Sequence, residues 1–237
     1  MEYDPIRDEI VVPELNAQAI LTYRGGANGD EAPIRVINGP DTQLSTPERL
    51  ALDPVHKEIF VPLGDHILVF PSQANGNVAP IRILKGPDTL LGASALTIDP
   101  IHDLLLVSGS APRRDPGDGP RGQVLIFNRT DQGNVKPRAV IGGPKSLLTR
   151  PMLIKAYPPK EEFLQGVSSS ERSSPENFVG VWSEHDNGDV PPRYTIGGPN
   201  GALRQVRGIT IDAKHKTVIF ADKYLNAAMT YYFPEFF

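Results

Sequence analysis

One phrase of fourteen residues occurs four times along this chain, and it constrains the fold more than any other feature of the sequence. The copies read ANGDEAPIRVINGP (27–40), ANGNVAPIRILKGP (74–87), DQGNVKPRAVIGGP (131–144) and DNGDVPPRYTIGGP (186–199). The glycine in the turn is Gly29, Gly76, Gly133 and Gly188, at spacings of 47, 57 and 55 residues. A period of this length, with several strands in each unit, is typical of a β-propeller.

A second phrase falls between the copies of the first. It reads YDPIRDEIVV (3–12), LDPVHKEIFV (52–61), IDPIHDLLLV (98–107) and IDAKHKTVIF (211–220), with a degenerate copy YPPKEEFLQG at 157–166. Together the two phrases divide residues 1–237, a single domain, into units of approximately 1–47, 48–93, 94–149, 150–205 and 206–237.

The second unit predicts four short strands, at 49–53, 58–63, 66–71 and 79–86. Their apolar runs are rich in Val, Ile, Leu and Phe, as expected of strands packed between neighbouring blades. Asp53-Pro54 predicts a turn between the first two strands, and Asn75-Gly76 predicts a tight hairpin between the last two. The 22 glycines and 24 prolines of the chain interrupt it too often for a long helix. We therefore expect an all-β fold.

The repeat resembles that of the NHL family of β-propellers, of bacterial type. The stretch GITIDAKHKTVIFADKYLNAAMTYYF (208–233) has Asp212, Asp222 and Asn226 in the matching places. ERLALDPVHKEIFVPLGDHILVF (48–70) is similar, with Pro62 and Asp65 replacing the Ala-Asp and Asn positions. The resemblance implies a propeller fold. It leaves function open, because such propellers bind proteins, RNA or small molecules, and some relatives are lyases or hydrolases.

The ends of the chain do not make complete four-stranded units. The first strand of unit one has only a few residues, and the chain stops in the third strand of unit five, at TYYFPEFF (230–237). We expect a β-propeller of about five four-stranded blades, either whole or an incomplete part of a larger propeller. An unpaired strand edge favours association, so we expect a protein partner or self-association there.

Composition excludes several classes of protein. The formal net charge is −4 with both signs interspersed, which excludes the basic surface of a nucleic-acid-binding protein. No apolar run is long enough to span a bilayer, so we expect no membrane insertion. The chain has no cysteine and its N-terminus lacks the pattern of a signal peptide. It is expected to be extracytoplasmic or secreted if it is a trimmed product, and cytoplasmic otherwise.

The histidines do not form a metal motif. His56, His102 and His215 occupy equivalent turns of different units, where Arg7 and Lys160 stand in the other two. Residues in separate blades lie apart around a ring, so a structural role in the turn is expected. The Asp and Asn residues Asp30, Asn77, Asn134 and Asp189 are expected to cap their own turns. No nucleophile elbow, phosphate-binding loop or zinc motif is present, and we predict no catalytic residue, metal or cofactor.

Long loops interrupt two units, at 108–122 and 166–177, on the face where binding residues concentrate. Arg150, Arg204 and Arg207 fall on the same face. The predicted partner-binding residues are Arg113, Arg114, Arg121, Arg172, Tyr231, Tyr232 and Phe233.

Two alternatives stay open beside a non-enzymatic scaffold that binds or assembles with another protein chain. One is a lyase or hydrolase with a polar site at the central channel, which would need convergent His, Arg and acidic groups. The other is a secreted sugar-binding propeller, which would need exposed aromatic residues on the loop face.

Overall fold

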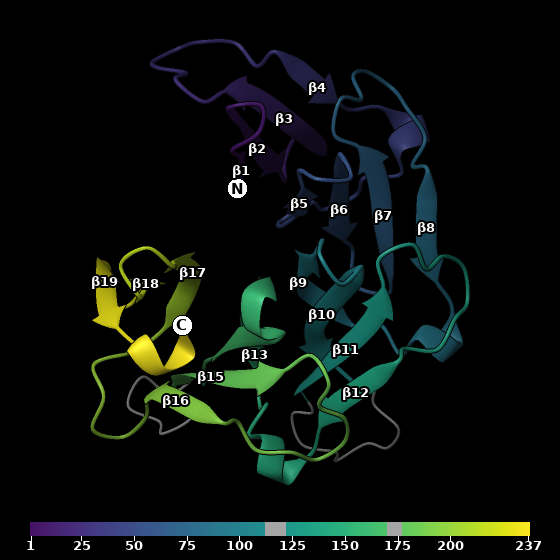
Figure 1. Ribbon diagram of the computed structural model, residues 1–237. Coiled ribbons are helices and arrows are strands. Elements are labelled where there is room, and N and C mark those ends of the chain that lie inside the picture. Colours follow the sequence, from purple (N-terminus) through teal and green to yellow (C-terminus); the bar gives the residue numbers. More distant parts are fainter. Residues whose placement is uncertain (112–121, 170–176) are drawn as a thin grey trace.

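The chain folds into five antiparallel sheets arranged around a central channel, as the computed structural model in Figure 1 shows. The structure describes residues 1–111, 122–169 and 177–237. In these ranges the secondary structure consists of strands and short 3-10 turns, with no α-helix. The chain is therefore an all-β, five-bladed β-propeller, as its repeats predict.

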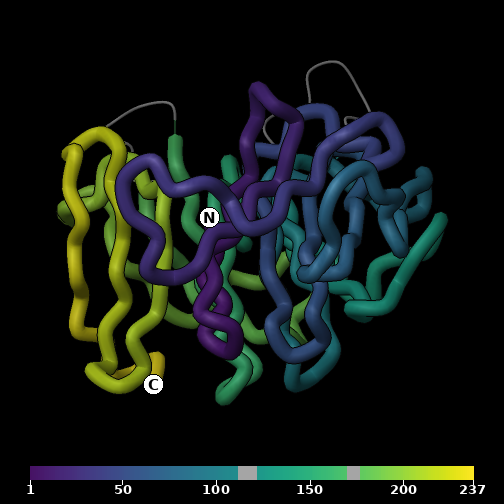
Figure 2. The backbone as a smooth tube through the Cα atoms, turned by 90° about the horizontal axis from the view of Figure 1, so that it is seen from above, coloured from purple at the N-terminus to yellow at the C-terminus, as the bar shows by residue number. Residues whose placement is uncertain are grey.

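Each sheet is one blade, and its strands follow one another in sequence from the channel outward. Blade 1 contains β1 (Glu2–Asp4), β2 (Glu9–Glu14), β3 (Ala19–Arg24) and β4 (Arg35–Ile37); blade 2 contains β5 (Ala51–Asp53), β6 (Glu58–Pro62), β7 (His66–Pro71) and β8 (Arg82–Lys85). Blade 3 contains β9 (Ala93–Asp99), β10 (Leu104–Ser110), β11 (Gly122–Asn128) and β12 (Ala139–Gly142); blade 4 contains β13 (Pro151–Tyr157), β14 (Glu162–Val167), β15 (Phe178–Ser183) and β16 (Tyr194–Gly197). Blade 5 has three strands, β17 (Val206–Asp212), β18 (Thr217–Asp222) and β19 (Ala227–Tyr232). Figure 2 shows the ring from its edge, with the strands running up and down the view.

The turn between the first two strands of a blade is organised by its aspartate. Asp53 accepts a hydrogen bond from the backbone N–H of His56 and lies 2.8 Å from the Nδ1 atom of the same residue. Asp99 does the same with His102, and Asp4 pairs with Arg7. The repeated basic residue therefore bonds to the aspartate of its own turn.

The hydrophobic core lies between neighbouring blades. Alternation along each strand sends successive side chains to opposite faces of the sheet, so every blade packs on two neighbours. Leu105 and Val107 of β10 pack toward blade 2, whereas Leu104 and Leu106 pack toward blade 4. Two further clusters join blade 1 to blade 2 and blade 4 to blade 5. Each of the four interfaces is apolar.

The fourteen-residue phrase also joins blades. Gly76, in the hairpin of blade 2, donates its N–H to the Val36 carbonyl of blade 1 over 2.6 Å and accepts a hydrogen bond from Asn38 N–H. Gly133 and Gly188 make the same parallel bridges to Leu84 and Ile141 of the preceding blade. We call this hairpin, with its Asn or Asp after the glycine, the latch.

The residue after the glycine has a different role from the one that its position in a turn predicts. Asn77 accepts the backbone N–H of Asp41, which lies in the 3-10 turn Pro40–Thr42 after β4 in the preceding blade. Asn134 and Asp189 accept the N–H groups of Asp88 and Lys145 in the same way. These side chains cap the turn of the neighbouring blade, because strand order brings that turn beside the hairpin.

The ring is open between its last and first blades. Among the described residues, none of the four core clusters joins blade 5 to blade 1, and Figure 1 shows the two blades standing apart. Blade 1 reaches blade 4 instead, through an ion pair of 3.2 Å between Glu2 and Lys155. No helix in the described ranges is long and apolar enough to cross a membrane.

Candidate functional site

The open side of the ring presents a face of blade 1 that is built like a buried blade interface. Ile10 pairs with Tyr23 across β2 and β3, and Val12 pairs with Leu21. The equivalent pairs of blade 2 are Ile59 with Phe70 and Val61 with Leu68. The two blades thus present nearly the same four side chains toward the preceding position in the ring.

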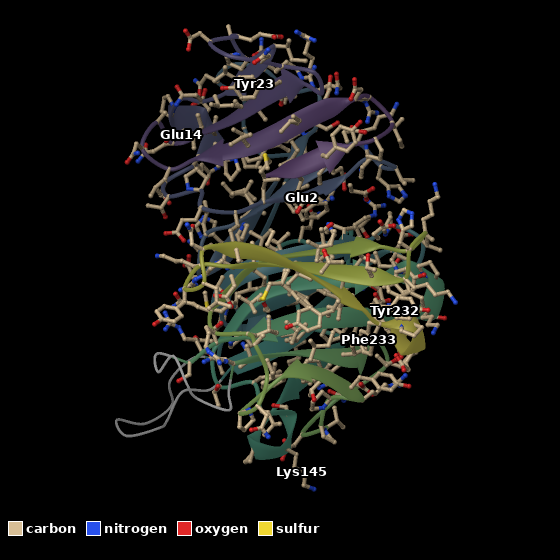
Figure 3. All side chains as sticks on the ribbon, turned by 90° about the vertical axis from the view of Figure 1, so that its left-hand side faces the viewer. Glu2, Glu14, Tyr23, Lys145, Tyr232 and Phe233 are labelled. Carbon is tan, nitrogen blue, oxygen red and sulfur yellow. The ribbon has the colours of Figure 1, made fainter. Side chains whose placement is uncertain are left out.

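The two equivalent faces differ in how deeply they are buried. All four residues of blade 2 are 0% exposed, because blade 1 covers them. The four residues of blade 1 are only partly buried, and Tyr3 beside them is 52% exposed. Figure 3 looks onto this side, with Tyr23 on the sheet of blade 1 and the sheet of blade 5 below it. The face therefore has the chemistry of an interface without a neighbouring blade on it.

Among the described residues, the latch of blade 1 also has no preceding blade beside it. Asn28, Gly29 and Asp30 are exposed and stand where Asn75, Gly76 and Asn77 stand in blade 2. Gly29 has φ = 60°, so the hairpin already has the left-handed glycine that the other latches use. An ion pair between Arg24 and Glu31 holds this loop to the end of β3. The apolar face and the exposed latch lie on one blade, and together they define the candidate site.

The free face of blade 5 is chemically different. Its outward residues include Ile219, Ala228 and Thr230, where blade 4 has Leu164, Val179 and Val181 in the equivalent places. Those three residues of blade 4 are buried in the interface to blade 5. Blade 5 consequently offers a smaller and more polar face than the interior blades.

The structure places the aromatic residues predicted at the C-terminal edge on two different sides. Tyr232 is 70% exposed, whereas Tyr231 packs on Phe220 and Phe233 stacks on Phe236. Alternation along β19 accounts for the difference between Tyr231 and Tyr232. Phe236 is fully buried against Tyr157 of blade 4, so the last residues of the chain pack into the interface between blades 4 and 5. Arg113, Arg114, Arg121 and Arg172 lie outside the described residues.

A polar cluster lies between blades 3 and 4, and sequence reasoning missed it. Asp99, His102 and Glu184 each offer one atom that could bind a metal, and these three atoms all lie within 4.8 Å of one another. Glu184 is 4% exposed, and neither of its carboxylate oxygens meets a hydrogen-bond donor among the described residues. Two carboxylates and an imidazole can hold a divalent transition metal, and a shared proton would satisfy the same two carboxylates.

Comparison with the equivalent positions of the preceding interface shows what is unusual about this cluster. The N–H of Glu184 bonds to the carbonyl of Glu161 just as the N–H of Arg129 bonds to that of Asp103, one interface earlier. Arg129 there pairs with Glu58 at 2.7 Å and lies 3.7 Å from Asp53, the equivalent of Asp99. Glu184 therefore replaces a cation with an acid. Aligning the repeats shows that Glu184 stands where another unit has Arg129. Only the fold shows that Glu184 faces Asp99.

Burial raises the pKa of Glu184 to about 9, and the nearby carboxylates of Asp99 and Glu161 act in the same direction. Burial opposes ionisation of Asp99 as well, but hydrogen bonds from the His102 ring and from backbone N–H groups hold its pKa below the ordinary value. The bond to Asp99 raises the pKa of His102. At neutral pH Glu184 is thus protonated while Asp99 carries the negative charge.

The fold defines the class of protein, a five-bladed β-propeller, and comparisons with known proteins bear on what it resembles. No protein-family model and no curated protein matches the chain. Among solved structures, it is similar to a chain of Kuenenia stuttgartiensis hydrazine synthase, with a TM-score of 0.64 at 11% sequence identity. The match covers 92% of this chain and 53% of the other, so this chain spans about half of that length. At this identity the similarity shows the fold alone.

Proposed function

We propose that this chain is a non-enzymatic propeller scaffold that assembles with another protein chain through the open side of its ring. The observation that carries the proposal is the apolar face of Ile10, Val12, Leu21 and Tyr23, which corresponds position by position to a fully buried face of blade 2. A partly exposed apolar sheet face beside an exposed hairpin is a typical protein-binding surface.

The interfaces inside the ring indicate what the partner presents. Where blade 1 covers blade 2, it contributes apolar side chains such as Ile37 and Leu44, together with a Gly-Pro turn that Asn77 caps. We therefore propose that the partner supplies a blade of the same kind, with an apolar outer strand followed by a Gly-Pro turn. Because the free face of blade 5 has Ala228 and Thr230 at positions that are Val in blade 4, a different chain fits better than a second copy.

The repeat of this scaffold is proposed to be of NHL type. Asp222, in the place that the family pattern gives to an aspartate, accepts backbone N–H groups from Arg204, Gln205, Tyr224 and Leu225. One carboxylate thus holds both the loop that precedes β17 and the turn that follows β18. This observation supports the type of repeat and implies no activity.

The alternative, a lyase or hydrolase acting at the central channel, has weaker support. Of the described residues that line the pocket at one end of the channel, Glu48 is the one carboxylate and none is a histidine. A binding role needs no acid–base pair, so we propose binding in preference to catalysis.

The proposal is tested with a labelled peptide of residues 32–44, APIRVINGPDTQL, which inside the chain docks on the latch of blade 2. Added to the full chain, it should give saturable fluorescence anisotropy. Val12→Glu should abolish the binding because it places a charge on the apolar face, and Asp30→Ala should weaken it because Asp30 caps the incoming turn. Ile101→Glu, at a residue 68% exposed in a turn of blade 3, is the matched control and should bind like wild type.

Absence of saturable binding, or equal binding by wild type and Val12→Glu, would overturn the proposed site. Circular dichroism checks that each variant is folded. Light scattering separates the possible occupants: a mass that grows with concentration, and that Val12→Glu abolishes, would identify a second copy and overturn the choice of a different chain.

A further inference from the structure

Three arginines meet in a pocket at one end of the central channel. Arg49 lies just before β5, Arg150 just before β13, and Arg207 within β17, so blades 2, 4 and 5 each contribute one. They line a cavity of about 440 Å³, which lies in the range of small-molecule sites.

The contacts of these arginines are to neutral groups. Arg49 donates to the Ser94 carbonyl over 3.0 Å and to the Met152 carbonyl over 2.5 Å. The Nη1 atom of Arg207 lies 3.4 Å from the Sδ atom of Met152. Within the described part of the chain, none of the three arginines forms an ion pair with a carboxylate, and Glu48 on the rim is exposed.

Positive charge therefore accumulates in this pocket. Burial lowers the pKa of Arg49, and the neighbouring Arg207 lowers it further, against the opposing effect of Glu48. Burial and Arg150 lower the pKa of Arg207. Guanidinium groups stay protonated at any ordinary pH, so the cost appears as repulsion and lost hydration, not as loss of a proton. An anion in the pocket would relieve both.

Sequence reasoning places Arg150, Arg204 and Arg207 on this face, and the structure brings two of them together. Arg204 donates instead to the carbonyls of Gly201 and Leu203 in its own loop. Arg49 carries no signal in the sequence, because it precedes an ordinary inner strand. Only the closing of blades around the channel brings it opposite Arg207.

We propose that this pocket binds a small organic anion with two or more negative charges, held by the guanidinium groups of Arg49, Arg150 and Arg207. Guanidinium pairs bidentately with carboxylates and phosphates, and three cations match a multivalent anion. The pocket is also lined by Pro62, Leu63 and Met152, which suit a short carbon skeleton. Polycarboxylates and organic phosphates share this chemistry.

Isothermal titration calorimetry at low ionic strength, with citrate and inorganic phosphate as probes, tests the proposal. Wild type should bind at least one probe at one site, and added salt should weaken the binding. Tighter binding of citrate would indicate a polycarboxylate, and tighter binding of phosphate a phosphorylated ligand. Arg207→Gln and Arg150→Gln should each weaken binding about tenfold or more, as loss of a charged hydrogen bond predicts.

Arg204→Gln is the matched control, because it removes an arginine three residues before Arg207 that does not line the pocket. It should bind like wild type. Thermal unfolding gives a second measurement: the probe that binds should raise the melting temperature of wild type and of Arg204→Gln equally, and that of Arg207→Gln less at the same concentration. Without a ligand, Arg207→Gln should be at least as stable as wild type, because it removes repulsion.

The proposal is overturned if neither probe binds saturably, if Arg207→Gln binds as tightly as wild type, or if Arg204→Gln weakens binding equally. Val12→Glu, which tests the open side of the ring, should leave anion binding unchanged. The two proposals therefore fail or succeed separately.

Discussion

At the scale of single residues, Glu184 has the most unusual environment in the described part of the chain. Glu184 is the repeat equivalent of Arg129, which lies beside Asp53 in the interface between blades 2 and 3. A buried acid therefore faces Asp99 where the repeat predicts a cation. Acids buried beside like charges take up a proton in preference to remaining ionised. The cluster therefore ties the stability of the interface between blades 3 and 4 to pH.

Glu184→Gln should make stability less dependent on pH. Because the folded-state pKa of Glu184, about 9, lies above the unfolded value, unfolding releases a proton between those two values. The stabilising effect of that proton is fully present below the unfolded pKa and is lost as pH rises through the folded pKa. Urea midpoints measured from pH 5 to pH 9 with EDTA should fall more steeply for wild type than for Glu184→Gln. Equal slopes would contradict the assignment.

At the scale of elements, the repeated phrase is a device for joining blades. Sequence reasoning identifies the positive φ of Gly29, Gly76 and Gly133 correctly. The predicted tight hairpin is wrong, because β7 ends at Pro71 and β8 begins only at Arg82, so a long connection joins the two strands. Sequence reasoning also does not identify the partner of the following Asn or Asp. A side chain that caps its own turn and one that caps a turn some forty residues away look the same in the sequence, and only strand order separates them.

The latch gives a prediction with an internal control. Asn134 accepts the N–H of Asp88 over 2.8 Å and donates to its carboxylate over 3.0 Å. Asn134→Ala should therefore lower the free energy of unfolding by about 1–2 kcal/mol, as the loss of a capping side chain does. Asp30→Ala, at the equivalent site with no preceding blade, should change it by less than about 0.5 kcal/mol. Chemical denaturation measures both, and equal losses would contradict the role of the latch.

At the scale of the whole molecule, the ring has four blade interfaces for five blades, and its stability should be unequal around it. β19 pairs only with β18 in the described residues, whereas β11 pairs with both β10 and β12. An edge strand and a half-covered sheet open more readily than an interior one.

Hydrogen–deuterium exchange should show this asymmetry. Peptides that cover β19 should exchange much faster than peptides that cover β11, because half of the edge amides have no strand to bond to. Binding of the 32–44 peptide should slow exchange in β2 and β3 of blade 1 and leave β19 unchanged. Equal protection of β11 and β19 would contradict the edge position of β19.

Local chemistry in the sequence determined the propeller and its units. Alternating apolar strands, Asp-Pro turns and Asn-Gly hairpins each act within a few residues, so the strands of the second unit and the all-β class could be predicted without coordinates. The binding sites depend on contacts between blades. Arg49 meets Arg207, Glu184 faces Asp99, and the four apolar residues of blade 1 are partly exposed, because the ring brings together, or leaves apart, residues distant in the chain. Pairing over such distances is decided by tertiary packing, and no local pattern of residues encodes it.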